Sequence, residues 1–279
     1  MIKVSDAFIA LPSRDNVTNK GDAGRVLVIG GDVGMCGAAL FAAEAAYRMG
    51  CGLVKVYTHP ENRIPIQTLL PEAVLSFWES GVDTPVLDAS LKWADAVVIG
   101  VGFGMGEWQK RILKKVISNA SCPIVFDADA LNIISRHKSL LSHLPSDSVI
   151  TPHVLELARL TGESVEDIKK DGFGILKKHF EGLDITVALK DSVVSILTNN
   201  NEEYLSASGD SSLSTGGTGD ILAGMIASLI AQKMPSCVSA VTSAYLHGKA
   251  GVLAGNKLGA RSVIARDVLA ALSDTIKEY

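Results

Sequence analysis

The 279-residue sequence lacks several features that mark particular classes of protein. It has no run of about 18 apolar residues, so we expect no transmembrane helix, and its N-terminus lacks the basic and apolar segments of a secretory signal. Its net charge of −4 argues against nucleic-acid binding by bulk electrostatics. We therefore expect a soluble, cytoplasmic protein with no nucleic-acid partner and no membrane partner.

Cysteine and aromatic residues are also scarce. Cys36, Cys51, Cys122 and Cys237 form no C-x-x-C motif, which predicts reduced, mostly buried thiols. Aromatics make up only 5% of the chain, whereas glycine occurs 26 times, a balance typical of α/β enzymes with many tight strand-to-helix turns. The 47% of hydrophobic residues suffices for one continuous core, so we expect a single domain over residues 1–279.

Two common nucleotide-binding motifs are missing as well. No G-x-x-x-x-G-K-[ST] sequence occurs, which excludes a P-loop of the usual kind. The glycines of residues 100–106 alternate without the G-x-G-x-x-G spacing of a dinucleotide fold. A nucleotide would therefore need a different type of site.

Short β-branched runs alternate with longer segments of helical period, which predicts an α/β fold with a mostly parallel central sheet and helices on both faces. After Lys190 the pattern changes to an antiparallel hairpin, residues 193–197 and 203–205. Residues 1–20 form an arm outside this pattern. The strands are expected at 25–29, 53–57, 73–77, 96–99, 124–126, 148–150 and 185–189, and the helices at 37–49, 107–118, 130–135, 154–160, 165–180, 220–232, 237–253 and 266–277.

The most informative motif is the segment from Ser214 to Asp220, which runs directly into an apolar helical pattern. Its glycines let the backbone turn sharply, so that the first free N–H groups of the helix point at an anion. A carboxylate repels phosphate, so Asp220 needs another task, that of a general base for a hydroxyl-bearing substrate. The N–H groups around Gly217, Thr218 and Gly219 would then stabilise a transferring phosphoryl group. The alternative is a simple turn with an acidic residue favourably placed at a helix N-terminus.

Other polar and glycine-rich segments follow predicted strands, at the edge where open α/β sheets bind ligands. Two glycine loops, residues 30–38 and 100–106, indicate a cleft, although crowded turns are equally compatible with the second loop. Asp127 and Asp129 have either a polar role or a helix-capping role. A lone histidine such as His153 is more often a surface or satisfied core residue, and Lys190 can meet a phosphate at this edge.

Taken together, these segments resemble the NAD(P)HX dehydratase family of the ribokinase-like superfamily, which repairs hydrated NADH and NADPH. The resemblance implies a ribokinase-like fold and a nucleotide-dependent dehydration of the S-form of the hydrated cofactor, with ADP (or ATP) as phosphoryl donor and Mg²⁺ as cofactor. It is carried by Lys20-Gly21-Asp22-Ala23-Gly24, Gly30-Gly31 with Met35-Cys36-Gly37-Ala38, Gly100 to Gly104, Asp127-Ala128-Asp129-Ala130-Leu131-Asn132, Thr151-Pro152-His153 and Gly216-Gly217-Thr218-Gly219-Asp220.

The resemblance also implies roles for particular residues. Glu156 stands where related kinases hold metal-bound water, which implies a magnesium role through water. The family usually has a glycine after the lysine and Pro-Gly-Glu after the histidine, and this sequence departs from it at both places. The implied contacts to the hydrated nicotinamide nucleotide are Ala38, Gly104, His153 and Asp220, and those to the adenine nucleotide are Lys190, Asp191, Ser192, Val193, Val194 and Gly219.

Two other functions fit the same residues. A ribokinase-like kinase of a small alcohol, such as a thiazole or pyrimidine alcohol, would share Asp220 and its anion site. A non-catalytic nucleotide-binding protein would fit the departures at Asp191 and Val154, although the retention of Asp220 beside the glycines counts against it. The small residues Ala240, Ala244, Gly248 and Gly251 at helical spacing indicate close packing, and a homo-oligomer is expected.

Overall fold

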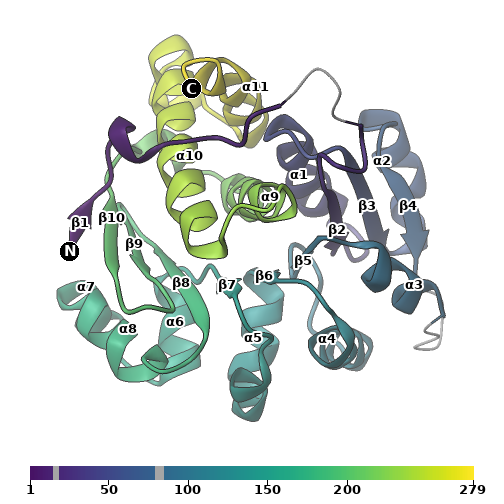
Figure 1. Ribbon diagram of the computed structural model, residues 1–279, viewed down its shortest axis with the longest axis horizontal. Helices are drawn as coiled ribbons and strands as arrows, with labels where there is room; N and C mark the ends of the chain where they lie inside the picture. Colours follow the sequence, from purple (N-terminus) through teal and green to yellow (C-terminus); the bar gives the residue numbers. More distant parts are fainter. Residues whose placement is uncertain (15–18, 79–84) are drawn as a thin grey trace.

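Ten strands of the computed structural model form one sheet, in the order β1-β10-β9-β8-β7-β6-β5-β2-β3-β4 (Figure 1). The structure describes residues 1–14, 19–78 and 85–279. All neighbouring strands are parallel except β9, which is antiparallel to both β8 and β10. The strands are β1 (Ile2–Lys3), β2 (Arg25–Ile29), β3 (Leu53–Thr58), β4 (Val74–Phe77), β5 (Ala96–Ile99), β6 (Ile124–Phe126), β7 (Ser148–Ile150), β8 (Ile185–Lys190), β9 (Val194–Leu197) and β10 (Glu203–Ser206).

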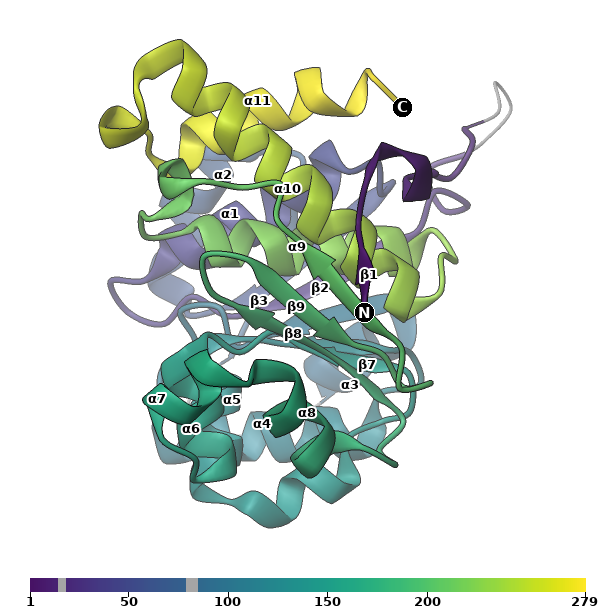
Figure 2. The ribbon, with the colours of Figure 1, turned by 90° about the vertical axis from the view of Figure 1, so that its left-hand side faces the viewer.

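Helices cover both faces of the sheet, as predicted (Figure 2). One face carries α1 (Cys36–Arg48), α2 (Arg63–Leu69), α9 (Thr218–Ala231) and α10 (Ser236–Leu258), with α11 (Ala265–Ile276) packed outside them. The other face carries α3 (Pro85–Trp93), α4 (Glu107–Asn119), α5 (Ala128–Arg136), α6 (Val154–Thr161), α7 (Val165–Lys170) and α8 (Gly172–Phe180).

The alternation of side chains along each strand divides the core into two layers. On β2, Leu27 and Ile29 pack in one apolar cluster, whereas Val26 and Val28 pack in the cluster on the opposite face. All four side chains are fully buried, which explains why this strand is a continuous apolar run rather than an alternating one. The predicted mostly parallel sheet with two covered faces is therefore confirmed.

One predicted helix is wrong. We expected a single helix over residues 165–180, but the structure has α7 and α8 with a break at Asp171. Asp171 has φ −145° and ψ 69°, which is not helical, and its carboxylate accepts a 3.0 Å hydrogen bond from the N–H of Gly174. An aspartate that caps a new helix is favoured over one that continues the old helix.

Several short elements were not predicted. These are α2, α3 and the two-residue strand β1, which pairs in parallel with β10 and so joins the N-terminal arm to the sheet. None of the described helices is long and apolar enough to cross a membrane. The four cysteines are free thiols, and burial raises the pKa of Cys51 to about 12.

Candidate active site

The first turn of α9 is the segment for which the sequence predicts an anion site. Gly217 precedes the helix with φ +97°, and a side-chain Cβ at this position would lie 2.7 Å from the ring of Phe41. The Thr218 hydroxyl donates hydrogen bonds to the carbonyls of Leu213 and Thr215, both at 3.0 Å, which fixes the turn. Across the part of the chain that the structure describes, the N–H groups of residues 218–220 have no hydrogen-bond partner. They are therefore available to an anion.

A buried ion pair lies beside this turn. Lys190, the last residue of β8, and Asp127, which follows β6, are joined by a 2.5 Å contact between Nζ and Oδ1. Thr151, after β7, donates a 2.8 Å hydrogen bond to the same Asp127 oxygen. A Cβ built on Gly219 would lie 3.3 Å from the Lys190 ammonium. The ends of three parallel strands thus meet the start of α9.

Asp127 was predicted to have either a capping or a polar role, and the structure shows the polar one. It occupies the N-cap position of α5, but its side chain makes no capping hydrogen bond. Its carboxylate is almost fully buried and accepts hydrogen bonds from Thr151 and Lys190 instead. Burial alone would lower the pKa of Lys190, but the charges of Asp127 and Glu156 outweigh it and raise that pKa.

Asp220 lies in this charged environment, in the first turn of α9. Burial raises the pKa of its carboxyl group to about 7, and the negative charge of Asp127 adds to the rise. Lys190 opposes this effect, whereas Asp129 and Glu156 reinforce it. A carboxyl group with a pKa near neutrality can accept a proton from a substrate hydroxyl at physiological pH.

His153 and Glu156 form a reciprocal cap at the start of α6. The His153 Nδ1 accepts hydrogen bonds from the N–H groups of Leu155 and Glu156, and the Glu156 carboxylate accepts one from the His153 N–H at 2.8 Å. The Nε2 of His153 therefore carries the proton. Burial, with Lys190 and Arg159 nearby, lowers the pKa of His153, while burial raises that of Glu156. His153 therefore caps α6 through Nδ1, while its side chain stays partly exposed.

The two glycine loops meet at the carboxyl edge of the sheet. The N–H of Gly31 donates to the Val101 carbonyl at 2.9 Å, and that of Asp32 donates to the Gly102 carbonyl at 2.6 Å. Gly104 has φ +80°, and its N–H donates to the Asp129 carboxylate at 2.8 Å. A Cβ on Gly102 would lie 2.9 Å from that of Ala38. Of the predicted substrate residues, the structure brings Ala38 close to the loop of Gly104, whereas His153 follows β7, two strands from β5.

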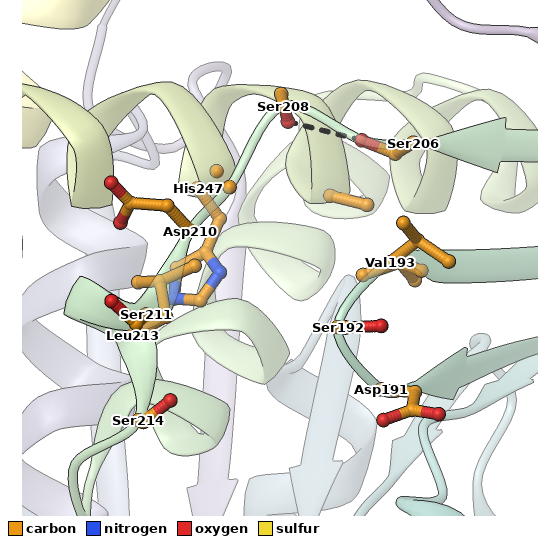
Figure 3. Close-up of a pocket in the computed structure, with 14 residues that line it drawn as sticks. Asp191, Ser192, Val193, Ser206, Ser208, Asp210, Ser211, Leu213, Ser214 and His247 are labelled. Atoms are coloured by element: carbon orange, nitrogen blue, oxygen red, sulfur yellow. Dashed lines mark hydrogen bonds between the residues drawn. The ribbon is translucent and has the colours of Figure 1, made fainter.

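A cavity of about 470 Å³ lies between the start of β9, the loop that follows β10 and α10, and we call it the β9 cavity (Figure 3). Four of the predicted nucleotide residues, Asp191 to Val194, line it, whereas Lys190 and Gly219 lie outside it at the first turn of α9. Its lining contains two carboxylates but no lysine or arginine. The lining residues are Asp191, Ser192, Val193, Val194, Ser206, Ser208, Gly209, Asp210, Ser211, Leu213, Ser214, Ala244, His247 and Gly248.

Residues 206–213 and His247 were missed by the sequence reasoning. Gly248 explains how the loop reaches α10, since a Cβ there would lie 2.1 Å from the Ser208 hydroxyl. That hydroxyl donates a 2.8 Å hydrogen bond to the Tyr245 carbonyl. Gly248, one of the small residues predicted to allow close packing of this helix, therefore packs against the loop that forms one wall of the cavity. No sequence signal distinguished His247, because α10 carries several other polar residues, Tyr245 and Lys249 among them.

The described residues hold no cluster of three or more His, Cys, Asp or Glu side chains that could bind a metal ion by themselves. Mg²⁺ usually binds one or two carboxylates together with substrate phosphates. The Glu156 carboxylate, with Asp127 and Asp220 near enough to affect its surroundings electrostatically, fits that mode. The donor set therefore suits an ion that enters with the nucleotide.

A parallel sheet, a helix N-terminus with free N–H groups and a carboxyl group of near-neutral pKa are typical of α/β enzymes that transfer phosphoryl groups. The sequence model of the NAD(P)H-hydrate dehydratase family matches residues 26–274. The chain belongs to this family.

Two curated relatives have similar sequences. The bifunctional NAD(P)H-hydrate repair enzyme Nnr of Escherichia coli K12 is 36% identical over 262 residues, which cover 94% of this chain and 49% of that protein. The ADP-dependent (S)-NAD(P)H-hydrate dehydratase of Neisseria meningitidis is 34% identical over 91% of this chain and 88% of its own length. The chain thus spans about half the length of the bifunctional relatives and most of the shorter one.

Solved structures agree with this assignment. A ribokinase-like superfamily protein from Enterococcus faecalis V583 superposes with a TM-score of 0.87 at 28% identity, covering 100% of this chain and 96% of the other. The ADP/ATP-dependent NAD(P)H-hydrate dehydratase of Bacillus subtilis, co-crystallised with ATP and Mg²⁺, gives 0.80 at 26% identity, covering 96% and 94%. The predicted ribokinase-like fold is confirmed.

Proposed function

We propose that this protein catalyses the nucleotide-dependent dehydration of the S-form of hydrated NADH and NADPH, with ADP (or ATP) as phosphoryl donor. The observation that carries the proposal is the position of Asp220. Its carboxyl group, which has a pKa of about 7, belongs to the same helical turn as the free N–H groups of α9. Membership of the NAD(P)H-hydrate dehydratase family supports the substrate. The relative from N. meningitidis, which is named ADP-dependent, supports the donor.

The chemistry follows from the poor leaving ability of hydroxide. The oxygen of the ring hydroxyl attacks the terminal phosphorus of the nucleotide while Asp220 accepts the proton of that hydroxyl. The bond between this phosphorus and the bridging oxygen of the nucleotide breaks at the same time. The N–H groups around Gly217 to Gly219, of which those of Thr218 and Gly219 have no partner among the described residues, stabilise the charge on the transferring group. The lone pair of the ring nitrogen then expels phosphate, and the adjacent ring carbon gives up a proton to that phosphate, so that the ring double bond forms again and the reduced nicotinamide is restored. With ADP the products are NADH, AMP, phosphate and a proton.

The two substrates would occupy opposite sides of the α9 turn. We place the hydrated nicotinamide ring against Ala38, Gly104 and His153, and the nucleoside in the β9 cavity beside residues 191–194. The nucleotide phosphates then run toward Gly219, where the Lys190 ammonium is close. Mg²⁺ bound with the nucleotide, with Glu156 contacting it through water, would neutralise phosphate charge.

One assay tests this function directly. The purified protein is incubated with hydrated NADH and ADP, ATP or no nucleotide, while near-ultraviolet absorbance and phosphate are measured together. We expect NADH and phosphate to appear in equal amounts and only with nucleotide. A stable phosphorylated product from a small alcohol, without recovery of NADH, would favour the kinase, and nucleotide binding without turnover would favour a non-catalytic protein.

The assembly of the protein is a separate proposal. We infer that residues 1–279 act as one domain and that this domain forms a homo-oligomer. The single continuous sheet supports the first statement. The small residues of α10 from which an oligomer was predicted, Ala240, Ala244, Gly248 and Gly251, are all buried within the chain and do not support the second. Light scattering coupled to size-exclusion chromatography measures the oligomeric state.

A further inference from the structure

Asp129 is a carboxylate beside the proposed nicotinamide site that the steps above do not use. It is a partly exposed residue in the first turn of α5, and its Oδ2 accepts a 2.8 Å hydrogen bond from the N–H of Gly104. Its Oδ1 has no hydrogen-bond partner among the residues that the structure describes, and it is not one of their inaccessible polar atoms. One oxygen of Asp129 is thus held in place, while the other is accessible to a ligand.

The backbone at the start of α5 is strained between the two aspartates of the segment. Ala128 has φ +45°, in the left-handed region that residues other than glycine rarely adopt. The N–H of Asp129 donates a 3.2 Å hydrogen bond to the Gly100 carbonyl, which helps to hold this turn. As a result the carboxylate of Asp127 enters the ion pair with the β8 lysine, whereas that of Asp129 binds the N–H of Gly104. Backbone strain of this kind clusters at functional sites.

Asp129 also lies close enough to Asp220 to affect it. Its negative charge is one of those that raise the pKa of the Asp220 carboxyl group. Asp127, the other carboxylate of this segment, is already occupied by its ion pair and its hydrogen bond from the threonine after β7. The proposed site therefore has two carboxyl groups within electrostatic reach of each other, one on α9 and one on α5 beside Gly104.

The dehydration removes two protons from the hydrated ring, and Asp220 accounts for only one of them. Asp220 accepts the proton of the hydroxyl. When phosphate leaves, the lone pair of the ring nitrogen forms a C=N bond and the ring becomes cationic. The neighbouring ring carbon must then lose a proton before the neutral, reduced nicotinamide is restored. The positive charge makes this proton acidic, so a carboxylate in contact with it is a sufficient base.

We propose that Asp129 is a second catalytic residue, whose Oδ1 removes the proton from this ring carbon. The C–H bond breaks, its electron pair forms the ring C=C bond, and the C=N electrons return to the nitrogen as its lone pair. Asp129 then passes the proton to the departing phosphate, which regenerates the carboxylate. The hydrogen bond from the Gly104 N–H fixes the carboxylate for this step. The inference rests on the proposed function, since it requires the hydrated ring to lie against Gly104.

Asp129→Asn separates this role from support of the loop. The amide oxygen of asparagine can accept the hydrogen bond from the Gly104 N–H, but its N–H₂ group replaces Oδ1 and takes no proton. Without the base, water adds again to the cationic ring, so nucleotide is consumed without formation of NADH. Phosphate and NADH are measured together with hydrated NADH and ADP. We expect a phosphate to NADH ratio of about one for the wild type, and of at least about 3 for the variant, whose rate of NADH formation falls about 10²- to 10⁴-fold.

Asp129→Ala provides a second test that does not depend on the first variant. The substitution removes the carboxylate, and added formate can supply one in the space that is left. We expect formate to lower the phosphate to NADH ratio of this variant toward one, whereas chloride at the same ionic strength should not. Deuterium on the ring carbon should slow NADH formation more in both variants than in the wild type, because proton removal becomes the slow step. A ratio of one with an unchanged isotope effect would mean that Asp129 only supports the loop, and would overturn the proposal.

Asp32→Asn is the matched control. A Cβ on Gly104 would collide with the Asp32 carboxylate, so this side chain lies against the same loop. Both of its oxygens already accept hydrogen bonds at 2.9 Å, one from the N–H of Val33 and one from the Gln109 amide. We expect its phosphate to NADH ratio to stay near one, whatever its rate. If the wild type forms no NADH, the proposed function itself is wrong; if the wild type and Asp129→Asn both couple phosphate to NADH with the same isotope effect, only the assignment of Asp129 is wrong.

Discussion

The Lys190 ammonium and the Asp127 carboxylate form a 2.5 Å ion pair next to Gly219, where α9 begins. Both side chains are held in position, because Lys190 ends a buried strand and Asp127 also accepts a hydrogen bond from Thr151. The pair sets the electrostatic potential at Asp220 from both sides: Asp127 raises its pKa and Lys190 lowers it. The acid and base chemistry of the site therefore depends on residues from three strands.

Breaking this ion pair should destabilise the fold. Lys190→Met leaves the Asp127 carboxylate buried without its cation, so we expect a loss of about 3 kcal/mol in the free energy of unfolding at pH 7.5. Urea denaturation monitored by circular dichroism measures this change. The double variant Lys190→Met/Asp127→Asn removes both charges and should recover most of the loss. If the double variant is as unstable as the sum of the two single variants, the charges are not coupled.

The rate should depend on pH through Asp220. Its ionised form is the base, so kcat should fall as pH drops through about 7, the raised pKa of this carboxyl group. Asp127→Asn removes a negative charge that opposes ionisation, so its acid limb should move to lower pH. Lys190→Met removes a positive charge that favours ionisation, so its limb should move to higher pH. Shifts of both variants in one direction would contradict this assignment.

Replacement of the base should separate activity from stability. We expect Asp220→Asn to lower kcat about 10²- to 10⁴-fold while the Kd of ADP changes little. Because folding raises this pKa, the folded protein binds the extra proton between about pH 4 and 7, and stability falls as pH rises through that range. Asparagine removes this penalty, so the variant should gain about 2 to 4 °C in Tm at pH 8. Retained turnover with normal nucleotide binding would exclude Asp220 as the base.

The wall of the β9 cavity can be tested without touching the catalytic turn. In Gly248→Ala the new methyl group would lie 2.1 Å from the Ser208 hydroxyl and 2.6 Å from the Gly209 nitrogen, so the loop must move away from α10. We expect the Kd of ADP to rise about tenfold or more, because displaced cavity walls cost on the order of 1–3 kcal/mol. Leu253→Ala, at a 40% exposed position of the same helix, is the control and should bind ADP normally.

The sheet and the turn at the start of α9 could be predicted from the sequence because their signals are local. Apolar runs bounded by glycine predict buried strands, and the segment from Gly217 to Asp220 predicts both a turn and a helix start. The break at Asp171 could not be read, since an aspartate inside a helical pattern looks the same whether it caps a new helix or faces solvent. The β9 cavity was predicted only on its 191–194 side. Its other wall depends on the contact of Gly248 with Ser208, which joins segments that no local pattern connects.

The pairing of β1 with β10 has a consequence for the order of folding. Ile2 pairs with Tyr204, so the first strand of the chain waits for roughly 200 further residues to be synthesised. At a translation rate of about 5–20 residues per second, that delay is on the order of 10–40 s. During this time the sheet can grow from β2 to β8 without β1. The amino-terminal segment therefore joins the sheet of the nascent protein late, after β10, the strand that leads into the β9 cavity, has been synthesised.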